Sequence, residues 1–331
     1  MRRRNVLSAI LLLASGAAVA QPATVTPPFR DVIVAAIPGV IAAGEEWQRV
    51  WHGTDNADGI LGTDDGGVLF AQEQPRRIGK LSATGEYSIA LADTHGVGSL
   101  STTADGQLFG VERTCTDPGR RSGGACTEPT AVARLLPQRR VLADNFAGAP
   151  LGRLNDLVVD RHGGAYFTVA GAYYADRDGG VTSLGDGLST NGIMLSPDES
   201  MLYVTNREVV VAFDVGPSGA TSNRRDFARL EAGGTGDGLA VDAAGRLYVT
   251  SQPGVQVFAA TGAYLGLIPT PRNAISVAFA GPAKKTLYIV GSGAALGPNG
   301  TEFVTPEGVR NNAKSIYRIE MLAEGFRGRA K

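Results

Sequence analysis

The sequence is poor in the residues that most often carry nucleophilic or transition-metal chemistry. Its 331 residues include three histidines and two cysteines. There is no G-x-S-x-G motif, so a Ser-His-Asp hydrolase has little support. The cysteines do not form a C-x-x-C pair and have no histidine at ligand spacing, which argues against a zinc or redox site.

Excess charge and long apolar segments are also missing. The formal net charge is −1 and the mature chain has no long basic run, which argues against nucleic acid or an anionic membrane surface as the main partner. The apolar run from Val6 to about Ala14 is well short of the ~20 residues of a membrane span. No segment has a long, capped helical period, which argues against an α/β fold. We therefore expect a small-molecule partner and no membrane span in the mature chain; the oligomeric state stays open.

The N-terminus has the pattern of a secretory signal peptide. Three arginines precede the apolar run, and Ala18-Val19-Ala20 follows it as a cleavage site. We expect residues 1–20 to be removed and the mature protein to be periplasmic or secreted. In an oxidising compartment, Cys115 and Cys126 would close a short Gly-rich loop as a local disulfide. The loop-closure entropy of such a bond is roughly 2–3 kcal/mol.

What the sequence does have is glycine, 45 residues of it, and a repeat. An apolar run, a turn and an apolar-aromatic run recur six times, each predicting two strands joined by a tight turn. Outer strands follow some copies, so we predict an all-β, six-bladed propeller formed by residues 21–331 as a single domain. The strand-like segment Glu46–Trp51 precedes the first copy, and whether it closes the ring against the last blade stays open. The blades open near residues 58, 97, 155, 191, 237 and 273.

The first residue of each inner strand should line the central channel. Most of these positions carry an oxygen-bearing side chain, and two of them are carboxylates. Such a set suits Ca²⁺ best and also Mg²⁺ or Mn²⁺, whereas Zn²⁺ is less well served without His or Cys. The alternative is that Asp and Asn merely start strands, because both favour turns. The expected metal ligands are Asp58, Asn155, Asn191 and Asp237, while Val97 and Asn273 occupy the remaining two positions.

Three motifs give the chain a family resemblance: Arg153-Leu-Asn-Asp156, Asn191-Gly-Ile-Met-Leu-Ser-Pro-Asp198 and Asp237-Gly-Leu-Ala-Val-Asp242. In this order and spacing they resemble the regucalcin/gluconolactonase family. The resemblance covers residues from about 58 to 320 and implies a six-bladed propeller, one divalent metal in the channel and hydrolysis of lactones.

Carried over residue by residue, the resemblance implies Asn191 and Asp237 as metal ligands, with Asn155 nearby. It further implies that Arg153 holds substrate oxygens and that Asp237 helps to activate the attacking water. The family normally opens its first blade with Glu-Gly-Pro, where this chain has Asp58-Gly59-Ile60. The shorter aspartate makes bidentate metal binding less certain.

The leading functional hypothesis is a metal-dependent hydrolase of a sugar lactone or related cyclic ester, in which the metal lowers the pKa of a bound water. His95, just before the second inner strand, is a weaker candidate for contact with substrate or for proton transfer, because a loop histidine bonded to backbone is the commoner case. Hydrolysis of phosphotriesters or other esters, and a non-catalytic binding or scaffold propeller, are the alternatives.

Overall fold

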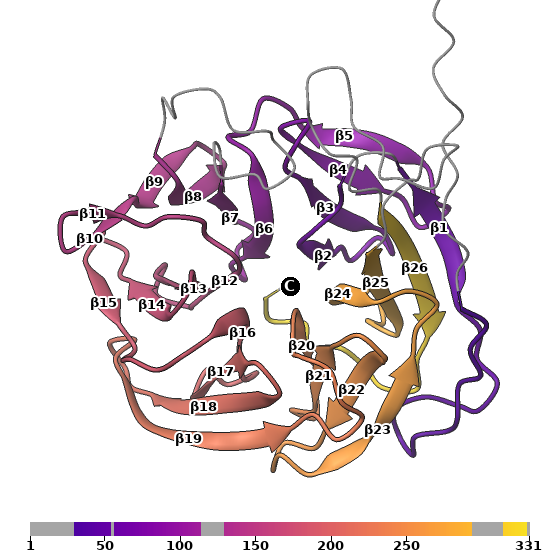
Figure 1. Cartoon of the computed structure of the whole chain (residues 1–331). Coiled ribbons are helices and arrows are strands. Elements are labelled where there is room, and N and C mark those ends of the chain that lie inside the picture. The colour runs from indigo at the N-terminus through magenta and orange to yellow at the C-terminus, as the bar shows by residue number, and fades with distance from the viewer. Residues whose placement is uncertain (1–29, 54–55, 114–128, 293–313, 330–331) are drawn as a thin grey trace, which may run out of the picture.

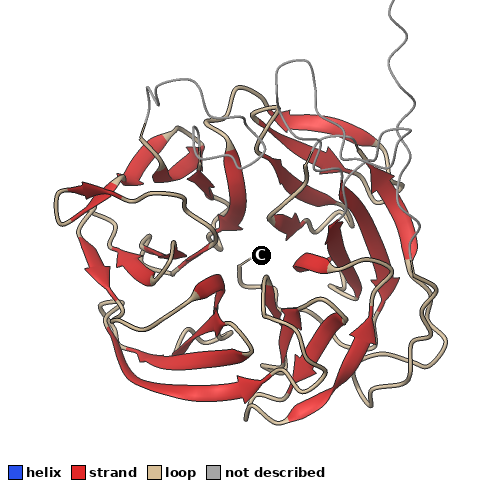
Figure 2. Cartoon of the chain, viewed as in Figure 1, coloured by secondary structure: helices blue, strands red, loops and turns tan. Residues whose placement is uncertain are grey.

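A computed structural model describes residues 30–53, 56–113, 129–292 and 314–329. These residues form strands, turns and loops, and no α-helix occurs among them (Figure 2). Within the same ranges, no helix has the length and apolar character to cross a bilayer. The predicted signal peptide and the predicted disulfide between Cys115 and Cys126 lie outside the described residues.

Six four-stranded antiparallel sheets stand in a ring around a central channel (Figure 1), which confirms the predicted propeller. The first sheet consists of β2 (Ile60–Gly62), β3 (Val68–Gln72), β4 (Arg77–Leu81) and β5 (Tyr87–Leu91). The second consists of β6 (Val97–Thr102), β7 (Leu108–Glu112), β8 (Ala131–Leu136) and β9 (Arg140–Ala143). The third consists of β12 (Leu157–Val159), β13 (Ala165–Thr168), β14 (Ala172–Ala175) and β15 (Val181–Ser183).

The remaining sheets follow the same order from the channel outward. The fourth consists of β16 (Thr190–Leu195), β17 (Met201–Asn206), β18 (Val209–Val215) and β19 (Thr221–Arg229). The fifth consists of β20 (Leu239–Val241), β21 (Leu247–Thr250), β22 (Gly254–Phe258) and β23 (Tyr264–Pro269). The sixth consists of β24 (Ala274–Ala280), β25 (Thr286–Ser292), β26 (Lys314–Glu320) and β1 (Gln48–His52). A small hairpin, β10 (Asn145–Phe146) and β11 (Ala149–Pro150), joins the second sheet to the third.

The ring closes through the first strand of the chain. β1 pairs antiparallel with β26, with Gln48 opposite Arg318 and His52 opposite Ser315. The strand-like segment at Glu46–Trp51 therefore completes the last blade, the possibility that the sequence left open. The first and last described strands lie side by side, so the propeller has no open seam at this point (Figure 1).

Apolar side chains pack between neighbouring blades rather than within one. Ile60 and Phe70 of the first blade share a buried cluster with Tyr288 of the sixth. Another cluster joins the third, fourth and fifth blades. A lone hairpin sheet exposes both faces, so the stacking of each sheet on the next is what removes this apolar surface from water.

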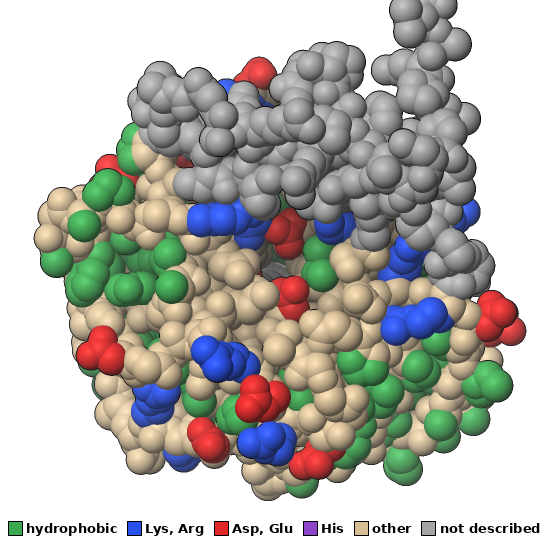
Figure 3. Space-filling model, in the orientation of Figure 1, with side chains coloured by type: hydrophobic (Ala, Val, Ile, Leu, Met, Phe, Trp, Pro, Cys, Tyr) green, Lys and Arg blue, Asp and Glu red, His purple; other side chains and the backbone are tan. Residues whose placement is uncertain are grey.

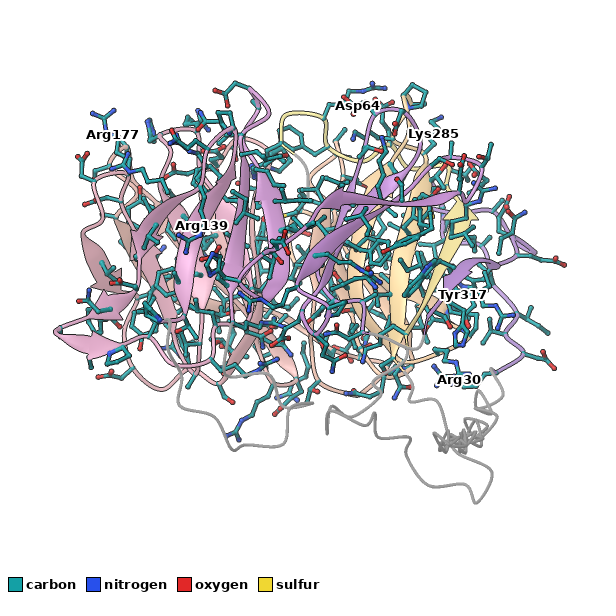
Figure 4. All side chains as sticks on the ribbon, turned by 90° about the horizontal axis from the view of Figure 1, so that it is seen from above. Arg30, Asp64, Arg139, Arg177, Lys285 and Tyr317 are labelled. Atoms are coloured by element: carbon teal, nitrogen blue, oxygen red, sulfur yellow. The ribbon has the colours of Figure 1, made fainter. Side chains whose placement is uncertain are left out.

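The two ends of the ring are different. Figure 4 is a view across the ring, with Asp64 and Lys285 at one end and Arg30 at the other. Asp64 lies in the turn that follows β2, so the inner strand runs from the Arg30 end, where Asp58 lies, towards the Asp64 end. We call the Arg30 end the entry face and the Asp64 end the turn face.

The C-terminal segment crosses the turn face. The backbone of Gly325 bridges to Asp242 in the β20–β21 turn, and Arg329 donates to the carbonyls of Leu195 (2.7 Å) and Ser196 (2.9 Å). The predicted metal ligands at the inner-strand starts therefore lie at the opposite, entry end of the channel.

Candidate functional site

Glycines bring the inner strands close together at the entry end. Asp58, Asn191 and Asp237 are each followed by a glycine. The amide of Gly59 donates to the carbonyl of Gly98 (2.9 Å), and that of Gly238 donates to Ile275 (3.0 Å). A Cβ atom on Gly192 would lie 2.0 Å from the backbone oxygen of Asp237, a distance that only glycine avoids. Backbones of neighbouring blades thus touch, and this sets the preceding polar side chains on the channel wall.

The predicted strand starts are accurate to within two residues. Asp58, Asn155 and Asp237 each lie two residues before an inner strand, whereas Asn191 is the second residue of β16. Val97 begins β6 and is buried. Asn273 precedes β24 by one residue and is exposed.

Arg113 is the main feature that sequence reasoning missed. It directly follows β7, and its side chain is only 2% exposed. Its Nη1 atom donates to Oδ2 of Asp58 (2.5 Å) and to Oε2 of Glu73 (3.1 Å). Burial alone would lower the pKa of Arg113, but the charges of Asp58 and Glu73 outweigh it and raise the pKa above its ordinary value. A permanent cation therefore lies among the predicted metal ligands.

Glu73, just after β3, joins two arginines. Its side chain is 2% exposed and receives both Nη atoms of Arg153, at 2.8 and 3.1 Å, besides the contact with Arg113. A buried carboxylate requires such partners, because an unpaired one is strongly destabilising. Asp58, Arg113, Glu73 and Arg153 thus form a row of alternating charge from the first, second and third blades. We call these four residues the charge row.

Asn155 and Asp156 have different roles. Arg113 Nη2 donates to the Asn155 backbone oxygen (2.5 Å) and, at 3.3 Å, to its Oδ1. Asp156 is buried and accepts hydrogen bonds from Ser99 Oγ (2.5 Å), from its neighbour's amide and from Ile193 N (3.1 Å). Asp156 therefore ties the second, third and fourth blades together, and Asn155 is the residue of this pair that faces Arg113.

Asp237 and Asn191 have uncommitted side chains. Within the described ranges, neither the Asp237 carboxylate nor the Asn191 carboxamide makes a hydrogen bond. Burial raises the pKa of Asp237 well above its ordinary value, and the charges of Asp58 and Asp156 raise it further, against the opposing effect of Arg113 and Lys314. The carboxylate of Asp237 thus lacks sufficient positive charge around it.

These residues fit a hard divalent cation in part. Among the described residues, the Asp237 and Asn191 side chains and the second oxygen of Asp58 have no protein partner, and oxygen donors of this kind are the ligands that Ca²⁺ prefers. No group of three or more His, Cys, Asp or Glu side chains arranged for a metal occurs in the described part, so the carboxamides are needed. The two carboxylates Asp58 and Asp237 carry a formal charge of −2, and Arg113, paired with Asp58, reduces the net charge of this group to −1.

His95 lies two residues before β6 and is partly buried. The neighbouring Gly96 carbonyl accepts the amide of Arg113 (2.9 Å), which places this loop at the entry end. Figure 3 shows a hollow at the centre of the ring, with acidic and basic side chains close to it. The molecule is therefore a six-bladed propeller with a small, mixed-charge site at the mouth of its channel.

Comparison with known proteins places this propeller in a family. The family model described as SMP-30/Gluconolactonase/LRE-like region matches residues 64–293, more than half of the chain. The chain belongs to this family, as its motifs predicted. Arg113, Asn155, Asn191 and Asp237 lie within the match, whereas Asp58 lies just before it.

Two curated relatives match part of the chain. A gluconolactonase from Zymomonas mobilis is 30% identical over 186 residues, which cover 47% of this chain and 52% of the relative. A pentonolactonase from Haloferax volcanii is 29% identical over 209 residues, covering 59% and 71%. The chain thus spans about half the length of the first relative.

Solved structures share the fold. A gluconolactonase from Xanthomonas campestris has a TM-score of 0.67 at 23% identity, over 91% of this chain and 99% of that one. The calcium-binding protein regucalcin from Agrobacterium tumefaciens has a TM-score of 0.58 at 16% identity, over 80% and 90%. At these identities the likeness establishes the propeller and nothing finer.

Proposed function

We propose that this protein is a divalent-metal-dependent hydrolase of a sugar lactone or a related cyclic ester. The observation that carries the proposal is the composition of the channel mouth. An uncommitted carboxylate and carboxamide, Asp237 and Asn191, lie in the same channel as an arginine that a buried glutamate anchors. Membership of the family alone would not support a hydrolase, because one fold can carry many functions.

Asp237, Asn191 and Asp58 would hold the metal, with Ca²⁺ the ion their oxygens suit best. When bound, the metal supplies a Lewis acid for the carbonyl and a more acidic water. A carboxylate within the metal site is the group that can take up the proton of this water. Asp237 would thus accept the proton of the attacking water.

Arg153 would bind the substrate's oxygens. Its guanidinium is fixed by two hydrogen bonds to Glu73, and its side chain is 35% exposed. A pre-oriented guanidinium loses less entropy on binding, and its hydrogen bonds to oxygen are charge-assisted. The reaction adds the water oxygen to the carbonyl carbon and breaks the ring C–O bond. It yields a hydroxy acid, whose proton is released at neutral pH.

Substrate class is testable with a panel. The purified protein should be titrated at constant pH with glucono-δ-lactone and a pentonolactone, and compared with a linear aryl ester and a phosphotriester. We expect acid release from the lactones well above the spontaneous rate. Turnover of the phosphotriester or the linear ester alone would move the proposal to another ester class, and turnover of none would favour a binding or scaffold propeller.

We further propose that the protein is exported and that Cys115 and Cys126 form a disulfide. The support is the charged, apolar and small-residue order of residues 1–20. N-terminal sequencing of the protein from a cell envelope fraction would give Gln21 first if the cleavage site is right.

A further inference from the structure

All three nitrogens of the Arg113 guanidinium donate to described residues of the first or third blade. Nε donates to the carbonyl of Leu154 (2.8 Å), Nη1 to Asp58 and Glu73, and Nη2 to Asn155. The group lies over Gly98, where a Cβ atom would come within 2.1 Å of Arg113 Cζ. A glycine in the second blade therefore makes room for this side chain, and the planar fork is held in one place.

This position brings Arg113 into contact with two of the four predicted metal ligands. Its Nη1 atom donates to Oδ2 of Asp58, and its Nη2 atom lies 3.3 Å from Oδ1 of Asn155. The other two ligands, Asn191 and Asp237, make no side-chain hydrogen bond in the described part of the chain. Two of the predicted metal ligands, Asp58 and Asn155, thus contact the Arg113 cation, whereas the side chains of Asn191 and Asp237 have no described partner.

We propose that Arg113 is a positioning residue that sets the divalent-metal affinity of the channel, by occupying one oxygen of Asp58 and opposing a second positive charge. The inference rests on the proposed metal site, and it concerns affinity rather than turnover. Like charges in a partly desolvated channel repel strongly, so a cation beside the ligands weakens the binding of another. Asp58 keeps one oxygen for a metal. It would therefore bind the metal through a single oxygen, in agreement with the expectation that the shorter aspartate does not bind in a bidentate way.

Weaker ligation of the metal would suit a hydrolase. A metal held by two or three protein oxygens keeps coordination positions for water and substrate, whereas a fully ligated one does not. The charge row also couples this site to Arg153, because Glu73 binds both arginines. An arginine that only stabilises the fold would not change the affinity for a divalent metal, whereas Arg113 would. The metal affinity therefore distinguishes the two roles.

The test is calorimetric titration of Ca²⁺ and of Mn²⁺ into the chelated, dialysed protein and into Arg113→Gln and Glu73→Gln. Arg113→Gln removes the cation but keeps an amide donor for Asp58, and we expect at least about ten-fold tighter binding. Glu73→Gln leaves Arg113 in place with one fewer carboxylate beside it, and we expect weaker binding. Opposite signs from two neutralising substitutions are the signature of charge at the site.

The matched control is Arg246→Gln. Arg246 also pairs with a buried carboxylate, Asp242 (2.5 Å), but in the β20–β21 turn at the turn face. Its loss should leave metal affinity unchanged even if the melting temperature falls. Unchanged or weaker metal binding in folded Arg113→Gln would overturn the inference, and so would unchanged binding in Glu73→Gln if the arginine variant does not fold.

The wild-type result separates this inference from the proposed function. Metal binding that appears only in Arg113→Gln would support the inference in its strongest form. Absence of binding in every variant would overturn it together with the metal site and the metal dependence of the proposed reaction, while lactone turnover measured without metal would show whether a metal-independent hydrolase remains.

Discussion

Arg153 holds both carboxylate oxygens of Glu73, with Nη1–Oε1 at 2.8 Å and Nη2–Oε2 at 3.1 Å. The two residues are 80 positions apart in the chain and come from the third and first blades. This fork-to-fork contact fixes the plane of a guanidinium at the channel mouth, and geometry of this kind is specific to arginine.

We therefore expect Arg153→Lys to raise KM by about ten-fold with a smaller change in kcat, because a single ammonium replaces an oriented fork. Steady-state kinetics on the best lactone would measure it. Arg161→Lys is the control, since Arg161 lies in the same blade at an exposed turn and pairs with Glu199 (3.0 Å). Equal KM values in wild type and Arg153→Lys would remove Arg153 from substrate binding.

Asp237→Asn should separate catalysis from stability. Burial and the charges of Asp58 and Asp156 disfavour the charged form of Asp237 and raise its pKa, so removing the charge should raise the melting temperature of the chelated protein. Activity should fall by about 10²-fold or more, the usual scale for losing a general base. Differential scanning calorimetry and a lactone assay provide the two readouts. A lower melting temperature with no activity in either protein would instead indicate a scaffold.

Gly192→Ala should disrupt the site through the backbone. The new Cβ would meet the Asp237 carbonyl at 2.0 Å, so the Asp237–Gly238 segment must move. Overpacking of this kind costs about 1–3 kcal/mol and would displace the proposed base. Gly216→Ala is the control, because its Cβ would meet only Ala220 O at 3.4 Å. Chemical denaturation measures the stability, and equal values for the two variants would contradict the proposed close approach.

The ring closure should respond to pH through His52. Its Nδ1 atom lies 3.0 Å from Ser315 Oγ, across the β1–β26 pair. Burial, Arg49 and Arg272 lower its pKa below 6.5, so the unfolded chain takes up a proton first as pH falls. Stability from this group is present above pH ~6.5 and is lost as pH falls towards the lowered value.

The size of this effect is under about 1 kcal/mol, because His52 is largely exposed and solvent screens its charge. Melting temperatures between pH 5 and 8 should therefore change slightly less in His52→Gln than in wild type. An equal or greater pH dependence in the variant would assign the change to other groups.

The sequence predicted the inner strands well because five of the six begin within two residues of an Asp or Asn, which is often followed by glycine. It did not settle the closure by β1, since pairing between residues near 50 and 316 leaves no local pattern. Arg113 and Glu73 were missed although each follows the second strand of its blade by one residue. Arg113 lies four residues after Phe109, whereas Glu73 lies three residues after Phe70. The spacing differs by one residue between the two blades, and the second blade has β-bulges.

The charge row therefore required the structure, because three blades must be brought together before its charges are neighbours. A useful signal was nevertheless present: Glu73 and Arg113 are charged residues directly after apolar strands. The residue directly after the second strand, compared from blade to blade, identifies both. The sequence predicts Asp58 in place of a glutamate, but it does not predict Arg113 beside it.

The central claim is tested most directly by glucono-δ-lactone turnover in the chelated protein before and after the return of Ca²⁺. We predict that chelation removes the activity, that Ca²⁺ restores it in the wild type, and that it restores none in Asp237→Asn. Full activity after chelation, or restored activity in Asp237→Asn, would contradict a metal-dependent reaction in which Asp237 takes part.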